Sequence, residues 1–258
     1  MVKIEAMGGE LAAVWQAKYC QKLTDWQLDR MLEAAGSWPV LLKKLGKRKR
    51  PDKVISAENV IGKWQPEYPQ KLNDLPGMPW LLFTRGNVEL LAWPTVAIVG
   101  SRHTTVHGRQ EAAIITRQFV KAGFATISGL ALGIDTVVHQ VTLAEKGQTL
   151  AVLAGGLDSV YPAANRQLAE DIISHEGLWL SEQPSGTPPL KPYFLARNRI
   201  VVALADYVVI VEAGLVSGSM ASANWAAELG KPLLAIPGSP GTDLLLHEGA
   251  LAADKLPI

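Results

Sequence analysis

The sequence lacks most features of secreted proteins, of proteins that bind a metal through cysteines and of proteins that span a membrane. It contains a single cysteine, Cys20, among 258 residues, which excludes an internal disulfide and any zinc site built from several cysteines. The N-terminal stretch MVKIEAMGGE has no apolar signal-peptide core, and no run reaches the roughly 18 apolar residues that span a bilayer. We therefore expect a cytoplasmic protein without membrane contact.

An excess of one charge is also absent. Lysine and arginine total 25, and aspartate and glutamate total 24, so the formal net charge is +1. A chain this neutral cannot hold nucleic acid through its overall charge, so such a function must depend on locally clustered cations. The P-loop lysine motif and GxGxxG are both missing, which disfavours P-loop NTPases and standard NAD enzymes.

The N-terminal part has a helical pattern. Apolar residues make up 48% of the chain, enough for a core, and over residues 10–45 they recur at helical spacing. Thr24 or Asp25 is a plausible N-cap, and Gly36 interrupts the pattern before the last helical segment. We expect a small helical module over residues 1–50.

A basic segment and an irregular segment follow this module. Residues 43–53 contain seven lysines and arginines and form either a solvated linker or an arm that contacts phosphates. Residues 54–93 are rich in Pro, Trp and Gly, which predicts an irregular lead-in. We therefore assign residues 51–93 to a linker and lead-in, and 94–258 to the main domain.

The main domain alternates short β-branched runs with helical patterns. We expect strands at Thr95–Val99, Ala125–Ser128, Leu150–Leu153, Leu178–Ser181, Val208–Glu212 and Leu233–Ile236, with helices near 107–122, 134–146, 165–176, 197–205 and 219–229. Several strands are apolar throughout, as in a parallel sheet covered on both faces. The predicted fold class is α/β, with a doubly wound, mostly parallel sheet whose ligands bind beyond the strands' carboxyl ends.

The first two predicted strands end in glycine and serine. Gly100, Ser101 and Arg102 follow the first strand, where glycine permits close approach and arginine suits phosphate. This tripeptide alone is a weak signal, since it would also serve a tight turn and a structural ion pair. Ser128 and Gly129 end the second strand.

An Asp/His pair and three polar residues lie in the next loops. Asp135 could cap the helix after the second strand, and His139 lies one turn further on the same face. Without a third ligand or a serine nucleophile, a structural hydrogen bond is favoured over a metal or catalytic role. Asp158, Tyr161 and Asn165 follow the third strand and could equally face a ligand or satisfy their own loop.

The densest mixture of cations and aromatic rings lies in the run KPYFLARNR (191–199). Its candidate site residues are Lys191, Phe194, Arg197, Asn198 and Arg199. Single-strand binders need cations for the backbone and rings for stacked bases. Either of the last two arginines could instead brace the sheet through Glu182 or Glu212.

A small-residue helix start completes the set. Ser217, Gly218 and Ser219 follow the fifth strand, where free N–H groups and the helix dipole favour an anion, although Ser219 could simply be an N-cap. One sheet edge thus gathers Ser/Gly loops, a helix start and several arginines. We predict a phosphate-binding site there, with single-stranded DNA as its ligand.

The motifs at these positions resemble those of the DprA/Smf family of DNA-processing proteins. They are VAIVGSR (96–102), ISGLALGID (127–135), GGLDSVYPAAN (155–165), ARNRI (196–200), VVIVEA (208–213), SGS (217–219) and AIPGS (235–239). The resemblance covers about residues 64–250, including the lead-in at 67–87. Several motifs in register make it specific, although each alone is weak.

The resemblance implies an extended Rossmann fold and a homodimer that binds single-stranded DNA. It further implies a non-enzymatic recombination mediator that protects incoming DNA and loads the RecA recombinase during natural transformation, without a metal or cofactor. Together with the loops above, it gives the expected DNA-binding set of Gly100, Ser101, Arg102, Ser128, Gly129, Lys191, Phe194, Arg197, Asn198, Arg199, Ser217, Gly218 and Ser219. The N-terminal module corresponds in position to a sterile-alpha-motif-like domain, and no winged-helix domain is expected.

The sequence departs from the family pattern at three places. Leu195 stands where a proline is usual, Ser222 where a threonine is usual, and Asp243 where an asparagine is expected. An added carboxylate at 243 could weaken a DNA contact, and residues 230–250 are a candidate dimer interface. The alternative function is a nucleotide-binding or nucleotide-cleaving Rossmann-like protein, for which Glu228 is a poorly placed catalytic candidate.

Overall fold

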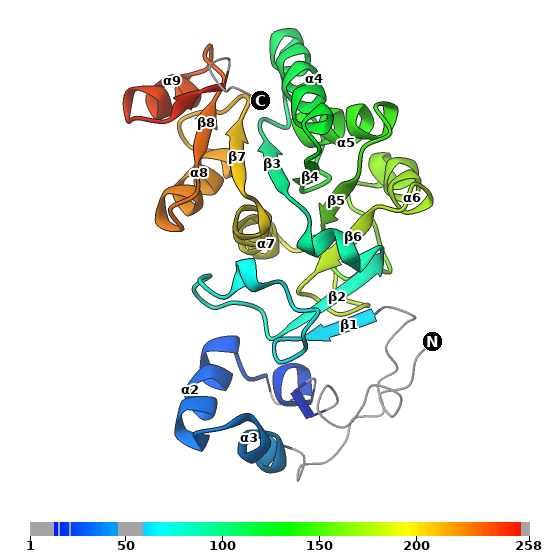
Figure 1. Cartoon of the computed structure of the whole chain (residues 1–258), viewed down its shortest axis with the longest axis vertical. Coiled ribbons are helices and arrows are strands. Elements are labelled where there is room, and N and C mark those ends of the chain that lie inside the picture. The colour runs from blue at the N-terminus through cyan, green and yellow to red at the C-terminus, as the bar shows by residue number, and fades with distance from the viewer. Residues whose placement is uncertain (1–12, 15, 21, 46–58, 254–258) are drawn as a thin grey trace.

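One mixed sheet forms the centre of the molecule (Figure 1). The computed structural model describes residues 13–14, 16–20, 22–45 and 59–253, and everything below refers to these. The strands are β1 (Asn59–Gly62), β2 (Leu81–Gly86), β3 (Thr95–Val99), β4 (Ala125–Ser128), β5 (Thr149–Val152), β6 (Leu178–Ser181), β7 (Tyr207–Ile210), β8 (Leu233–Ala235) and β9 (Leu251–Ala252). Their order is β1-β2-β6-β5-β4-β3-β7-β8-β9, and only the β1–β2 and β2–β6 pairs are antiparallel.

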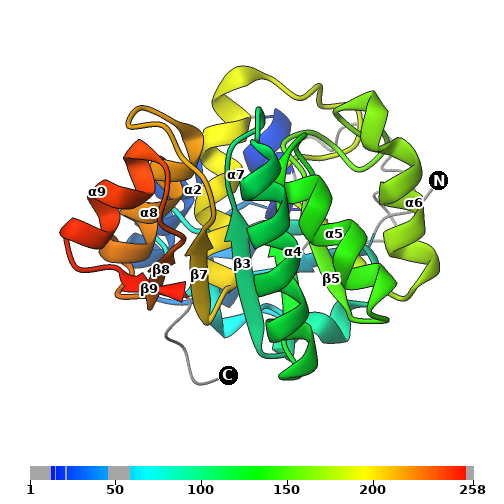
Figure 2. The ribbon, with the colours of Figure 1, turned by 90° about the horizontal axis from the view of Figure 1, so that it is seen from above.

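Helices cover both faces of this sheet (Figures 1 and 2). They are α2 (Asp25–Ala35), α3 (Trp38–Leu45), α4 (Val106–Lys121), α5 (Ile134–Ala144), α6 (Arg166–Ser174), α7 (Lys191–Leu204), α8 (Gly218–Glu228) and α9 (Pro240–His247). Figure 2 shows α4 and α5 in front of β3 and α7 behind it. The expected doubly wound α/β architecture is confirmed, and most predicted boundaries agree closely with the observed ones.

The central strand β3 shows why both faces are apolar. Successive side chains of a strand point to opposite faces. Val96 and Ile98 belong to the core that includes Phe119 of α4, whereas Ala97 and Val99 belong to the core on the α7 side. A strand buried on both faces needs a continuous apolar run, and TVAIV provides it.

The N-terminal helices pack against the lead-in. Thr24 caps α2 through a capping box with Gln27, as one of the two expected N-caps, and Gly36 ends the helix with a φ of 73°. Asp29 accepts hydrogen bonds from the indole N–H of Trp80 at 2.9 Å and from Lys63 at 2.7 Å. These contacts fix the helical module on the β1–β2 side of the sheet. Residues 46–53 of the basic segment lie outside the described residues.

The lead-in is more regular than expected. Residues 54–93 were predicted to be irregular, but β1 and β2 lie within them, and Phe83 of β2 pairs with Ser181 of β6. The run Leu81–Phe83 is fully buried, and β2 pairs with β1 on one side and with β6 on the other. The lead-in therefore extends the sheet itself.

Helix α7 begins earlier than expected. The prediction placed this helix at 197–205, whereas it spans Lys191–Leu204. Pro192 lies in the first turn, where its missing N–H has no helical partner to lose, so it starts the helix instead of breaking it. Lys191, Phe194 and Asn198 consequently lie on one face of a single helix.

Candidate functional site

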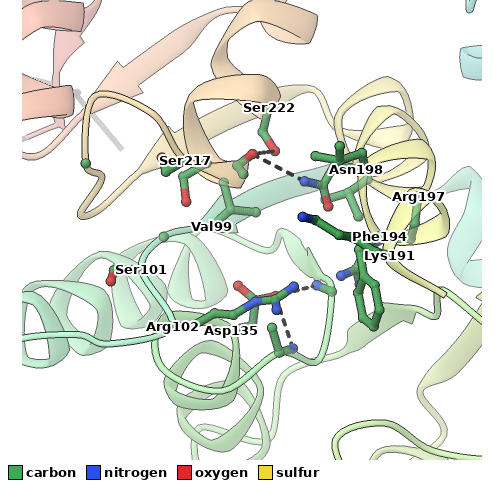
Figure 3. A pocket seen from close by; sticks show the side chains of 18 residues that line it. Val99, Ser101, Arg102, Asp135, Lys191, Phe194, Arg197, Asn198, Ser217 and Ser222 are labelled. Carbon is green, nitrogen blue, oxygen red and sulfur yellow. Dashed lines mark hydrogen bonds between the residues drawn. The ribbon is translucent and has the colours of Figure 1, made fainter. Parts of the chain in front are cut away.

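The candidate site lies where the winding of the sheet reverses. From β3 the chain winds outward through β4, β5 and β6, and then returns to place β7 on the other side of β3. Ligands of doubly wound sheets bind at such a switch point. A pocket of about 370 Å³ opens there (Figure 3), lined by Val99, Gly100, Ser101, Arg102, Gly129, Ala131, Asp135, Lys191, Phe194, Leu195, Arg197, Asn198, Val201, Gly214, Ser217, Gly218, Ser219 and Ser222.

The structure brings nearly all predicted site residues to this pocket. Only Ser128 and Arg199 of the predicted set do not line it. Ser128 is fully buried and donates to the Ile98 carbonyl at 2.9 Å, which ties β4 to β3. Arg199 pairs with Glu182 at 2.5 Å, so this arginine takes the bracing role that the sequence left open. A DNA contact by either residue stays a prediction.

The rim of the pocket combines cations with an aromatic ring. Arg102 and Lys191 are exposed, and Phe194, which lines the same pocket, is half-buried. The Arg102 guanidinium lies over the Phe194 ring, 5.1 Å from its centroid, in a cation–π contact. The rim therefore offers both groups that a single strand needs, namely charge for its phosphates and a ring for its bases.

The start of α8 forms the opposite wall, as Figure 3 shows. Ser217 is the N-cap, and its hydroxyl accepts from the Met220 N–H at 3.3 Å. The Asn198 side chain donates to the Gly218 carbonyl at 3.3 Å, which ties α7 to α8. Within the described part of the chain, the N–H groups of Gly218 and Ser219 have no acceptor. Such N–H groups at a helix start attract an anion.

A buried charge pair forms the floor. Arg197 is only 4% exposed, and its guanidinium donates to the Val152 carbonyl. Burial lowers the pKa of Arg197 to about 10, against the opposing charge of Asp135, so the side chain remains a cation at neutral pH. Burial raises the pKa of Asp135, while Arg197 and two backbone N–H groups lower it. The floor is thus a cation partly compensated by one carboxylate.

Gly129 makes room for this cation. A Cβ atom at Gly129 would lie 2.0 Å from Nη1 of Arg197, so a larger residue would displace the guanidinium from its place. Asp135 accepts hydrogen bonds from the N–H of Gly129 at 3.0 Å and of Ala131 at 3.2 Å. The carboxylate therefore shapes the loop before α5, and the expectation that it caps this helix is wrong because its oxygens are directed to the loop amides.

His139 has a structural role. Its Nδ1 lies 2.7 Å from the Thr149 hydroxyl. The structural hydrogen bond that the sequence favoured for His139 is therefore confirmed, and its partner is Thr149. Burial lowers the pKa of His139 to about 3, and the Arg197 charge adds to this shift. The imidazole is therefore neutral at physiological pH.

Acid is expected to destabilise the protein through His139. The folded pKa lies below the unfolded value near 6.5, so the unfolded state binds more protons as pH falls. Between pH 7 and pH 5 this linkage should lower the free energy of unfolding by about 2 kcal/mol. Urea denaturation at both values checks it. In His139→Gln this contribution should vanish, and Asp135, present in both proteins, cancels in the comparison. Identical pH dependence in the two proteins would contradict the assignment.

Glu212 holds the loop that presents Arg102, a role that the sequence reasoning missed. Its carboxylate accepts from the Thr104 hydroxyl at 2.8 Å and the Thr105 N–H at 3.0 Å, and its carbonyl accepts from the Ser101 N–H at 2.8 Å. The only signal in the sequence is an acid directly after the apolar run of β7.

The three candidates after the third predicted strand, Asp158, Tyr161 and Asn165, differ in what their side chains contact. Asn165 donates to the Leu130 carbonyl and the Thr136 hydroxyl, both at 2.9 Å, and Asp158 accepts from the Gly186 N–H at 2.9 Å. These two therefore satisfy loop groups. Tyr161, in contrast, projects an exposed ring.

Two residues named for other reasons do not line the pocket. Asp243 was expected beside it, but its carboxylate accepts from the Gly238 N–H at 2.9 Å at the start of α9. Glu228 is the last residue of α8, whose first turn forms the pocket wall. Leu195 and Ser222, the other departures from the family pattern, do line the pocket.

In the described residues, no three His, Cys, Asp or Glu side chains are placed to hold a metal ion. No helix among them has both the length and the apolar character to cross a membrane.

The sequence comparisons identify the family. The model of the family described as DNA recombination-mediator protein A matches residues 59–255. Protein Smf of Synechocystis is 40% identical over 195 residues, covering 72% of this chain and 49% of that protein. DNA processing protein DprA of Streptococcus pneumoniae is 41% identical over 189 residues, covering 71% and 66%. The matches thus span from about half to two thirds of these relatives' lengths.

Solved structures show the same fold. The X-ray structure of DNA processing protein A from Streptococcus pneumoniae superposes with a TM-score of 0.76 at 31% identity, covering 95% of this chain and 90% of that one. The Helicobacter pylori protein, solved for its unique single-stranded DNA binding mode, gives 0.69 at 35% identity, covering 77% and 93%. The chain is a Rossmann-like α/β protein with a cationic pocket at its switch point. It belongs to the DNA recombination-mediator protein A family, also called DprA/Smf.

Proposed function

We propose that this protein binds single-stranded DNA in the switch-point pocket and acts as a recombination mediator. The observation that supports this best is the joining of Arg102, Lys191 and the Phe194 ring in one pocket mouth, opposite the free N–H groups of α8. The Helicobacter pylori relative, with a matching fold, binds single-stranded DNA.

Each wall of the pocket has a distinct task in this proposal. Arg102 and Lys191 contact neighbouring phosphates, and the N–H groups at the start of α8 donate to an oxygen of another phosphate. The Phe194 ring stacks on a base, which is available in a single strand but covered by neighbours in a duplex. The buried Arg197 contributes positive potential without leaving the floor.

Binding without hydrolysis is favoured by the carboxylates present. Asp135 is the only carboxylate among the residues that line the pocket, and it is buried with its oxygens bonded to loop amides. An enzyme that cleaves nucleotides needs an accessible side chain that acts as a general base, so this carboxylate is poorly suited to that reaction. Incubation with nucleoside monophosphates should release no free base.

The wider role in this proposal follows the family. The protein works in the cytoplasm as a homodimer, protects incoming single strands and loads RecA on them during natural transformation. Its support is the family membership, and RecA-catalysed strand exchange on DNA coated by single-strand-binding protein tests it directly. Acceleration by this protein is the expected result.

A titration of single- and double-stranded oligonucleotides tests the binding itself. Fluorescence anisotropy at two salt concentrations should show tighter binding of the single strand. The logarithm of its binding constant should fall by about 0.7 for each phosphate neutralised, per tenfold rise in salt. Two rim cations therefore predict a slope near −1.4. Absence of binding at low salt, or equal affinity for both forms, would overturn the proposal.

A further inference from the structure

Tyr161 places a second aromatic ring beside the pocket mouth. Its ring centroid lies 5.5 Å from that of Phe194, and the two ring planes are 64° apart. The side chain is 54% exposed, although Tyr161 is not among the residues that line the pocket. Phe194 thus contacts Arg102 and Tyr161, which makes a continuous row of one cation and two rings.

The loop that presents Tyr161 is firmly held. The Gly156 N–H donates to the Thr187 carbonyl at 2.9 Å, and Asp158 accepts from the Gly186 N–H. Beyond Tyr161, the Asn165 side chain fastens the loop to the Leu130 carbonyl at 2.9 Å. A ring on a rigid loop is already ordered before a ligand arrives, so little conformational entropy is lost on binding.

The polar end of Tyr161 has no structural task in the described residues. No hydrogen bond to its hydroxyl is found in residues 13–14, 16–20, 22–45 or 59–253. A tyrosine that stabilised the fold would bury its ring and pair its hydroxyl. The exposed ring beside a cationic pocket is instead typical of a stacking surface for bases.

We propose that Tyr161 is a second base platform, so that two neighbouring bases of a bound single strand lie on Phe194 and on Tyr161. This inference rests on the proposed function and extends it to strand selection. Two rings inclined by 64° cannot both stack on bases that remain parallel to each other. The strand must therefore turn between the two nucleotides, which a single strand does readily and a base-paired, stacked duplex does not. The inclined rings select single strands by shape.

Replacement of the ring tests this directly. Tyr161→Ala should bind an oligothymidine about 5- to 100-fold more weakly than the wild type, as the loss of one stacked base predicts. Tyr161→Phe keeps the ring and should bind within about twofold of the wild type. The salt dependence should be the same in all three proteins because no phosphate contact is lost. Duplex affinity should not change in Tyr161→Ala.

An abasic oligonucleotide of the same length separates stacking from structure. It keeps the sugar-phosphate chain but has no bases, so wild type and Tyr161→Ala should bind it equally. If Tyr161→Ala lost as much affinity for the abasic strand as for oligothymidine, the ring would only shape the pocket, and the inference would be overturned. Trp26→Ala, which removes an exposed aromatic ring from α2, is the control and should leave both affinities unchanged.

The outcomes for this inference and for the proposed function are distinguishable. If the wild type binds oligothymidine and Tyr161→Ala binds it as tightly, the second platform is refuted and the pocket stands. If the wild type binds no oligothymidine at low salt, the proposed function and this inference fall together. Thermal unfolding of each variant confirms that the compared proteins are folded.

Discussion

Replacing Arg197 with methionine should lower the free energy of unfolding by about 3–5 kcal/mol, because it removes one member of a buried pair of charges. Asp135 would keep its burial but lose the cation that favours its ionised form. The Val152 carbonyl would also lose its hydrogen-bond donor. The methionine side chain would take the place of the planar guanidinium next to Gly129. Urea denaturation at pH 7 measures the change.

A double-mutant cycle isolates the charge interaction in this result. Arg197→Met combined with Asp135→Asn leaves no unpaired charge and should be more stable than the sum of the two single changes predicts. The asparagine oxygen can still accept from the loop amides, so the loop is kept. Additive changes would show that Arg197 acts only through its packing and its bond to Val152.

The change Arg102→Ala should weaken single-stranded DNA binding about 10- to 100-fold, since it removes a charge-assisted phosphate contact and the cation beside the stacking ring. The Arg102 side chain is exposed and does not belong to the core, so the free energy of unfolding should change by less than about 0.5 kcal/mol. The salt slope should become shallower by about 0.7, as expected for one phosphate fewer.

Arg30→Ala is the matched control for this experiment. Arg30 is an exposed arginine that also lies over an aromatic ring, that of Trp26, but on α2. The substitution Arg30→Ala removes the same charge from the chain as Arg102→Ala. It should leave both the affinity for single-stranded DNA and the salt slope unchanged. Equal losses in the two variants would mean that net charge, and not the pocket, holds the strand.

The sequence predicts the parallel core well because the decisive signals there are local. A strand such as β3 is apolar along its whole length, and the turn residues that follow it mark its end. β2 could not be predicted in this way, since a short run between glycines and prolines becomes a strand only when β6 is beside it. Its partner lies about a hundred residues further along the chain, beyond the reach of any local pattern.

The candidate site divides along the same line. Placement of Gly100–Arg102 and Ser217–Ser219 follows from their positions after strands, which the sequence shows. The different roles of Arg197 and Arg199 do not, because they depend on partners far away in the sequence. Arg197 is buried and donates to the Val152 carbonyl, whereas Arg199 pairs with Glu182.

The position of the pocket between β3 and β7 also determines when it can exist during synthesis. Val96 of β3 pairs with Tyr207 of β7, and the pocket lining extends from Val99 to Ser222. A nascent chain therefore exposes the loop with Arg102 long before α7 and α8 have left the ribosome. Pairing across so many residues closes a long loop and is slow. The switch-point pocket therefore cannot form until the chain through Ser222 has been synthesised, and shorter nascent chains lack it.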